Sequence, residues 1–134
     1  IVNACLALPS GGWGQCRGLT WQRGSEDYRS MLDAVRAFHE KHRFRELGGE
    51  EMTYRVALMA EELGEISACV TKGKGKDALA EEVADLLILV MGTAIAQGFD
   101  LNGAFWSKME KLGRREGRLV DGRIRVSEFR SVGD

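Results

Sequence analysis

Apolar residues recur every three to four positions over most of the chain, which is the spacing of amphipathic α-helices. Four helices are predicted, over about residues 25–42, 51–71, 78–97 and 101–115. Near the end of the chain the pattern changes to alternation around Asp121-Gly122, which predicts a β-hairpin with a type I′ turn. The expected fold class is therefore all-α: a four-helix bundle built on a central helical hairpin, with a small C-terminal β-hairpin.

The same pattern divides the chain into three segments. Residues 1–24 hold the single proline, five glycines and two of the three cysteines, with no clear period, and are expected to form an irregular N-terminal arm. Residues 25–116 form the helical domain, and residues 117–134 form a C-terminal hairpin and tail. Two interpretations of the arm stay open: a cover over a neighbouring subunit and a loosely ordered tail.

The central helical hairpin carries two pairs of acidic residues. Glu62 and Glu65, like Glu82 and Asp85, are three positions apart and therefore share a helix face. The glycine-rich connection Lys72–Lys76 is short, so the two helices should run antiparallel. Counting outward from this loop places Glu65 opposite Glu82 and Glu62 opposite Asp85. The lysines of the loop, roughly 10–15 Å along the helices from the acids, are expected to form a solvated turn.

Four carboxylates that meet in one patch need a counter-charge. Asp85 leads directly into the apolar run Leu86–Met91, and no Lys, Arg or His occurs between Ala78 and Phe99. A buried charge must be paired or must bind a metal. Because every donor atom is an oxygen, Mg²⁺ is favoured, with Mn²⁺ as the alternative cation. The competing interpretation is that each acid pair is a solvated helix face.

The acid motif also resembles a known family. The arrangement Glu-Glu-x-x-Glu, a spacer, then Glu-x-x-Asp on a helical hairpin is similar to that of the MazG superfamily of all-α nucleoside triphosphate pyrophosphohydrolases, and the similarity extends from about Tyr28 to Arg115. The resemblance implies a MazG-type four-helix bundle. It also implies Mg²⁺-dependent hydrolysis of a nucleoside triphosphate to the monophosphate and pyrophosphate, as housecleaning of the nucleotide pool.

Site roles follow from the resemblance together with the spacing. The predicted metal ligands are Glu62, Glu65, Glu82 and Asp85. Glu61 is the candidate catalytic base, since the first Glu of this motif is thought to accept a proton from the attacking water in some relatives. A solvated or merely supporting Glu61 is the alternative.

Residues for the rest of the nucleotide are expected on the outer helices. Lys108 matches the family's phosphate-contacting lysine, and Arg114 and Arg115 extend a basic cluster around it. A basic helix end favoured by the helix dipole is the competing interpretation. Phe38 and His42, at the end of the first helix, are the candidates for a base pocket, or else a core aromatic residue beside a partly exposed histidine.

Composition narrows the range of partners and locations. The formal net charge of −1 gives no bulk attraction to nucleic acid, and no apolar run reaches the roughly 18 residues of a membrane span. The three cysteines show no disulfide framework or metal spacing, so a reducing cytoplasm is the expected location. The helix over residues 78–97 is apolar on several sides, which predicts a homodimer or homotetramer.

Two other functions remain open on sequence grounds. A related enzyme acting on phosphoribosyl-ATP in histidine synthesis shares the acid motif. A non-catalytic helical module could also use the acids to bind a structural metal ion or a partner.

Overall fold

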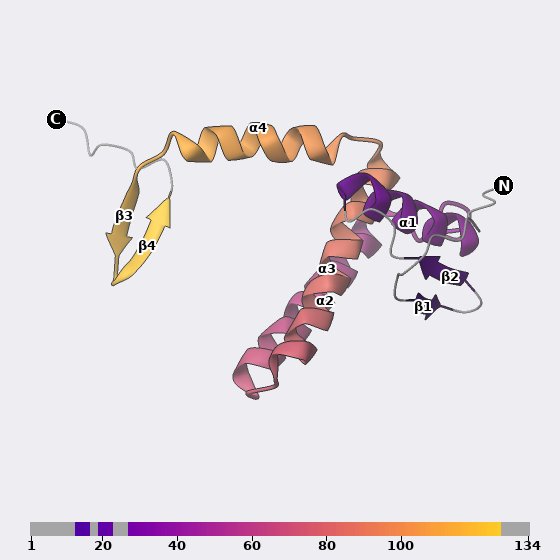
Figure 1. Ribbon diagram of the computed structural model, residues 1–134, viewed down its shortest axis with the longest axis horizontal. Coiled ribbons are helices and arrows are strands. Elements are labelled where there is room, and N and C mark those ends of the chain that lie inside the picture. Colours follow the sequence, from indigo (N-terminus) through magenta and orange to yellow (C-terminus); the bar gives the residue numbers. More distant parts are fainter. Residues whose placement is uncertain (1–12, 17–18, 23–26, 127–134) are drawn as a thin grey trace. The chain divides into compact units, whose positions relative to one another are not determined.

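The computed structural model describes residues 13–16, 19–22 and 27–126 and divides the chain into two compact units, residues 1–99 and 100–134. The first unit contains strands β1 (Trp13–Cys16) and β2 (Leu19–Gln22) and helices α1 (Tyr28–Lys41), α2 (Met52–Thr71) and α3 (Lys76–Gln97). The second contains helix α4 (Leu101–Gly113) and strands β3 (Gly117–Val120) and β4 (Arg123–Val126) (Figure 1).

The predicted all-α class with a C-terminal hairpin is confirmed, because four helices and the β3–β4 pair are present. Packing of all four helices into one bundle stays a prediction. The arm expected to be irregular contains an antiparallel pair, with Trp13 opposite Gln22 and Cys16 opposite Leu19. Cys5 lies outside the described residues.

Local sequence explains where α1 and α3 begin. The Asp27 carboxylate accepts a hydrogen bond from the Ser30 backbone N–H at 2.8 Å, so Asp27 is the N-cap of α1. Ser25, whose side chain and position also suit an N-cap, lies outside the described residues. Helix α3 begins at Lys76, after Gly75, and not after Asp77 as predicted. Asp77 stands instead in the first turn of α3, where its charge is favourable to the helix dipole.

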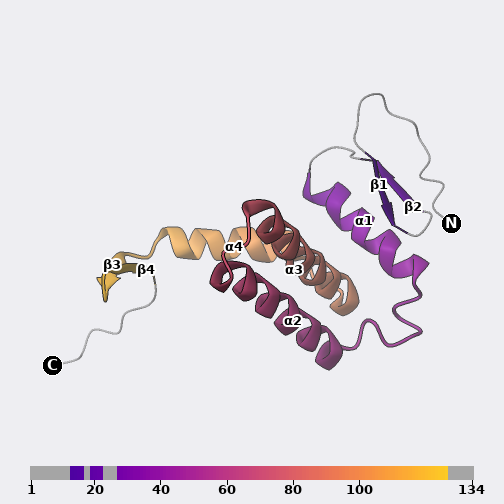
Figure 2. The same cartoon turned by 90° about the horizontal axis from the view of Figure 1, so that it is seen from below.

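Helices α2 and α3 form the antiparallel hairpin that the loop predicts and lie side by side over their length (Figures 1 and 2). Gly73 takes the left-handed conformation in the turn, with φ of 62°. At the other end of α3, Gly98 takes the left-handed conformation that is common after the last helical residue, with φ of 68°. Helix α1 packs against α3. These contacts fix which face of each helix meets its neighbour.

The centre of the first unit is built around a buried cation. Arg55 is fully buried, and its guanidinium donates to the Thr93 hydroxyl at 3.0 Å and to the carbonyls of Gly49 and Leu89 at 3.1 and 2.7 Å. The Thr93 hydroxyl also donates to the Leu89 carbonyl at 2.8 Å. Because burial of an unpaired charge is costly, these contacts hold the start of α2 firmly against the second half of α3.

Gly92 makes room for this arrangement. A Cβ added at Gly92 would collide with the Arg55 guanidinium and would lie 2.6 Å from Nε2 of His39, which is itself buried on α1. Real Cβ atoms do not approach other atoms so closely. The absent side chain at this one position therefore lets α1, α2 and α3 meet.

The second unit ends in a regular hairpin. Leu119 pairs with Ile124, and the turn residues Asp121 and Gly122 have φ of 50° and 74°, as the predicted type I′ turn requires. Helix α4 is capped by Asp100, whose carboxylate accepts from the Gly103 N–H at 3.0 Å.

No helix in the described part of the chain combines the length and apolar character needed to cross a membrane.

Candidate functional site

The acidic residues of the hairpin meet across the two helices. Carboxylate oxygens of Glu62, Glu82 and Asp85 lie within 4.8 Å of one another. Glu65 joins them through a hydrogen bond between its carboxyl group and that of Glu82. The facing pairs are those given by the loop symmetry, whereas the role of the four side chains as metal ligands stays a prediction.

The surroundings of this carboxylate cluster are more open than the apolar run after Asp85 suggests. Glu62 and Glu82 are half-buried, but Asp85 is exposed. The apolar run after Asp85 predicts a helix that is enclosed on most sides. In the first unit it is covered by α2 on one side and α1 on another, and Asp85 stands at the rim between them.

Burial and neighbouring carboxyl groups raise the pKa values of two of the acids. Burial, followed by the charges of Asp85, Glu65 and Glu61, raises the pKa of Glu62 above its usual range. For Glu82, the hydrogen bond that its protonated carboxyl group donates to Glu65 is the largest cause of a raised pKa, and burial comes next. The Lys74 charge opposes this rise. Lys74 of the turn therefore acts electrostatically on the cluster, although its exposure fits the predicted solvated turn.

The cluster fits a hard divalent cation. Oε2 of Glu62 is buried and has no hydrogen-bond partner among the described residues, which is unusual because nearly all buried polar atoms have one. Within the same residues, no lysine, arginine or histidine forms an ion pair with any of the four acids. A set of carboxylate oxygens is the donor set that Mg²⁺ and Mn²⁺ prefer.

The raised pKa values predict how stability depends on pH without metal. At pH values between the ordinary glutamate pKa of 4.5 and the raised pKa values, the folded protein binds more protons at Glu62 and Glu82 than the unfolded chain does. The free energy of unfolding should therefore fall as pH rises through this window. Urea unfolding in a chelator from pH 4.5 upward, compared with Glu62→Gln, isolates the effect. The variant should become more stable relative to wild type as pH rises, and a constant difference would contradict the assignment.

The other predicted catalytic and phosphate residues are divided between the two units. Glu61 is exposed on α2, and its charge contributes to the raised pKa of Glu62. Lys108, Arg114 and Arg115 belong to the second unit. Lys108 is exposed, Arg114 forms an ion pair with Glu110, and Arg115 is half-buried. Their contact with phosphate stays a prediction.

An apolar groove reaches the cluster from the side of α1. Its volume is about 550 Å³. Phe38 and the buried Val35 line it from α1, and the buried Met91 lines it from α3. Asp85 stands at one end. One predicted base-pocket residue, Phe38, therefore lines a cavity that reaches the carboxylates.

The second predicted base-pocket residue lines another cavity. The rings of His42 and Phe38 meet edge-on with centroids 4.7 Å apart. His42 nevertheless faces a cavity of about 470 Å³ that also contacts Tyr54 and Leu58 of α2. The two side chains therefore line different cavities although their rings are in contact, and a base pocket that uses both stays a prediction.

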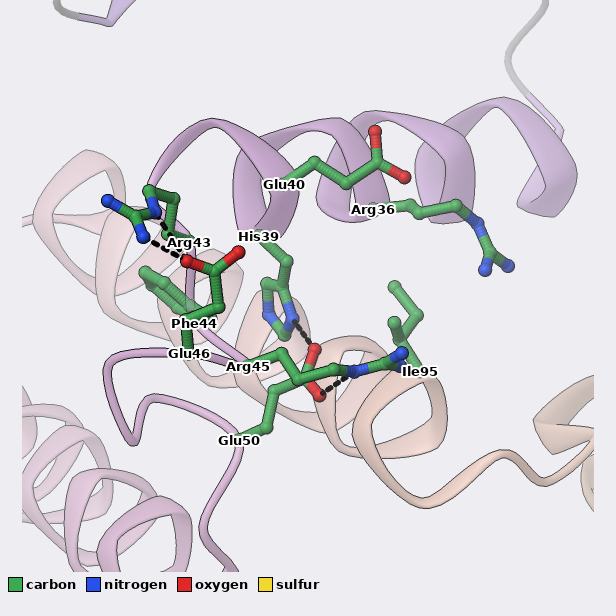
Figure 3. A pocket seen from close by; sticks show the side chains of 9 residues that line it. All are labelled: Arg36, His39, Glu40, Arg43, Phe44, Arg45, Glu46, Glu50 and Ile95. Carbon is green, nitrogen blue, oxygen red and sulfur yellow. Dashed lines mark hydrogen bonds and ion pairs between the residues drawn. The ribbon is translucent and has the colours of Figure 1, made fainter. Parts of the chain in front are cut away.

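A third cavity, of about 280 Å³, lies beside His39 (Figure 3). Glu50 lies between a histidine and an arginine there: one of its carboxylate oxygens is 3.5 Å from Nδ1 of His39, and the other accepts from Nε of Arg45 at 3.1 Å. Burial, and then the Arg55 charge, lower the pKa of His39, whereas Glu50 raises it. These contacts tie the loop before α2 to α1.

Arg55 is the residue of this region that sequence reasoning missed. It stands three positions before Leu58 and seven before Glu62, on the stripe of α2 that faces α3. This spacing was the available signal, because a cation on a helix face that also carries the predicted ligands must point toward the partner helix. Its hydrogen bonds fix α2 against α3 near the carboxylates: Leu89, which it contacts, is one turn beyond Asp85.

The fold and the site together define an all-α protein that gathers carboxylates on an antiparallel helical hairpin. The model of the MazG nucleotide pyrophosphohydrolase domain matches residues 51–120, which is 70 of the 134 residues. The chain therefore belongs to this family. The match begins at the N-cap of α2 and ends with β3, so it contains the whole carboxylate cluster and leaves α1 outside. Neither the curated proteins nor the solved structures gave a significant match.

Proposed function

We propose that the protein is a Mg²⁺-dependent nucleoside triphosphate pyrophosphohydrolase that forms a nucleoside monophosphate and pyrophosphate. The observation that carries this proposal is the opposition of Glu62 to Asp85 and of Glu65 to Glu82, within the region matched by the family. An unpartnered buried oxygen on Glu62 supports a ligand role over a solvated face. Cleansing of the cytoplasmic nucleotide pool is the role we assign to the reaction.

Each group of residues has a distinct part in this reaction. Glu62, Glu65, Glu82 and Asp85 would hold the cation, with Mn²⁺ as a substitute for Mg²⁺. Bound there, the cation supplies charge neutralisation at the phosphate oxygens. Glu61 is exposed beside the cluster and is placed in the sequence to accept a proton from the attacking water.

The nucleotide needs contacts beyond the cation. A triphosphate carries more negative charge than one divalent ion neutralises, and we assign the remainder to Lys108, Arg114 and Arg115. The base would lie in the groove against Phe38. From Asp85 to Met91 the groove follows six residues of α3, about 9 Å, which is room for a nucleoside. His42 would contribute only through its edge contact with Phe38.

A pyrophosphate-release screen tests the function. Canonical and modified ribo- and deoxyribonucleoside triphosphates, together with phosphoribosyl-ATP, are assayed with Mg²⁺, with Mn²⁺ and with EDTA. We expect release from nucleoside triphosphates that depends on the cation and stops in EDTA. Release from phosphoribosyl-ATP alone would identify the related enzyme of histidine synthesis. Stabilisation by metal without release from any substrate would identify a non-catalytic module and would overturn the proposal.

A further inference from the structure

His39 is a titratable side chain inside the first unit that the proposed reaction does not use. It is 5% exposed on α1 and is adjacent in the chain to Phe38, which lines the apolar groove. Histidine is the side chain whose ordinary pKa, 6.5, lies closest to neutral pH. A buried histidine where α1, α2 and α3 meet can therefore make the packing of these helices depend on pH.

The two ring nitrogens of His39 face opposite charges. Nε2 and the Arg55 guanidinium both lie against the vacant side-chain position of Gly92, so the two groups are neighbours. Nδ1 faces the Glu50 carboxylate at 3.5 Å. This environment favours a neutral ring with its hydrogen on Nδ1 and the lone pair of Nε2 toward Arg55. A further proton would have to bind at the nitrogen that faces a positive charge.

The charge of a protonated His39 would be poorly compensated. Glu50 is the nearest acid, but 3.5 Å is longer than a normal hydrogen bond, and Nδ1 has no hydrogen-bond partner in the described part of the chain. The other oxygen of Glu50 accepts from Arg45. Burial, followed by the Arg55 charge, accordingly lowers the pKa of His39 by more than Glu50 raises it.

The remaining charges around His39 balance one another. Besides Arg45 and Glu50, the cavity beside it is lined by two arginines and two glutamates of α1 and the following loop (Figure 3), namely Arg36, Glu40, Arg43 and Glu46. Arg43 and Glu46 form an ion pair. Residues 86–97 of α3 have no ionisable side chain, and α2 contributes the buried Arg55. Among the described residues, the cation in excess is thus the one beside Nε2.

Helix α1 is the element that protonation would displace. The cavity of about 280 Å³ beside His39 leaves room for the ring to move away from Gly92 and Arg55. The ring also contacts Phe38, with centroids 6.4 Å apart, so the two side chains would move together. Phe38 and Val35 line the groove that reaches Asp85. Separation of α1 from α3 would therefore remove one wall of this groove.

We propose that His39 is a pH-sensitive contact: α1 is held against α2 and α3 while the imidazole is neutral, and it separates from them when the imidazole gains a proton. The proposal is independent of catalysis, because it rests on the packing of His39 alone. The detached helix binds the proton more readily than the packed helix does. The contact therefore weakens as pH falls below the ordinary histidine value of 6.5.

Hydrogen exchange of the metal-free full chain, followed peptide by peptide by mass spectrometry, tests the contact. Protection is expressed relative to an unfolded chain at the same pH, which removes the intrinsic effect of pH on exchange. Uptake of one proton changes an opening equilibrium by at most about tenfold per pH unit. The protection of α1 amides should therefore fall by about three- to tenfold between pH 7.5 and pH 5.5.

Two glutamine variants assign this pH dependence to one imidazole. His39→Gln has no titratable group at the contact, so the protection of its α1 amides should not depend on pH in this range. The matched control is His42→Gln, because His42 is the only other histidine of the chain and is half-buried at the C-cap of the same helix. The control should keep the pH dependence of wild type.

Three outcomes would overturn the proposal: α1 protection in wild type that is constant with pH, a pH dependence that persists in His39→Gln, or one that His42→Gln abolishes. If His39→Gln is unfolded, the control variant decides, since His39 is then the single histidine and its imidazole signal can be followed by NMR. That signal should titrate below 6.5, in the range where α1 loses protection. Titration at or above 6.5 would contradict the proposal.

Discussion

Replacing Asp85 with asparagine is expected to lower Mg²⁺-dependent pyrophosphate release by about 1,000-fold or more. Asparagine keeps the size of the side chain but removes one of the negative charges that face Glu62 across the hairpin. A ligand change that forfeits about 4 kcal/mol of transition-state stabilisation corresponds to this factor. The quantity to measure is kcat/KM on the best substrate, over a range of Mg²⁺ concentrations.

Asp77→Asn provides the control on the same helix. Asp77 is exposed in the first turn of α3, two turns before Asp85, and takes no part in the carboxylate cluster. Its substitution should leave turnover unchanged. Asp85→Asn should keep the fold, and its metal-free form should be at least as stable as wild type, because one source of repulsion is removed. Wild-type turnover by Asp85→Asn would show that Asp85 is not a metal ligand.

Gly92→Ala is expected to lower the free energy of unfolding by about 2 kcal/mol, the middle of the range for overpacked cores. The added methyl group meets the Arg55 guanidinium and lies 2.6 Å from Nε2 of His39. Neither side chain can move aside easily, since both are buried and Arg55 is held by three hydrogen bonds. Urea unfolding of the metal-free protein, followed by circular dichroism, measures the loss.

Gly64→Ala is the matched control and should change stability in the opposite direction. Gly64 is also in a helix interior, on α2, but nothing lies within 4 Å of the position of its missing Cβ. Alanine is favoured over glycine in a helix interior by about 1 kcal/mol, so this variant should be more stable than wild type. If Gly92→Ala were also stabilising, the close packing of α1, α2 and α3 around Gly92 would be wrong.

The position of the acids could be predicted because it depends only on helix period and loop length. Two pairs spaced by three residues and placed symmetrically about a short turn must face each other if the helices are antiparallel. The exposure of Asp85 could not be predicted in the same way. An apolar run shows that a helix packs against another element. It does not show which element this is, or how far along the helix the contact extends.

The apolar stripe of α2, which its helical spacing predicts as core, shows the same difficulty. The repeat that includes Val56, Leu63 and Val70 correctly identifies a face that water does not favour, yet all three side chains are more than half exposed. Periodicity reports the chemistry of a face and carries no information on whether its neighbour belongs to the same chain.

Arg55 escaped prediction for a different reason. Its partners are the backbone carbonyls of Gly49 and Leu89 and the hydroxyl of Thr93, which come together only when α2 and α3 pack. Every residue has a backbone carbonyl group, so the sequence does not indicate which of these groups will accept a hydrogen bond from an arginine. A cation held by acids would have been found through its oppositely charged partners, as the ion pair of Arg114 with Glu110 can be.

The hydrogen bond between the carboxyl groups of Glu65 and Glu82 would weaken the binding of a cation to these two groups. Two carboxyl groups can share such a bond only while one of them keeps its hydrogen, and a coordinated cation needs both oxygens bare. Protons and the proposed magnesium ion would therefore compete for the same carboxylate oxygens. Binding of the proposed ion would release a proton, and acidification would release the ion.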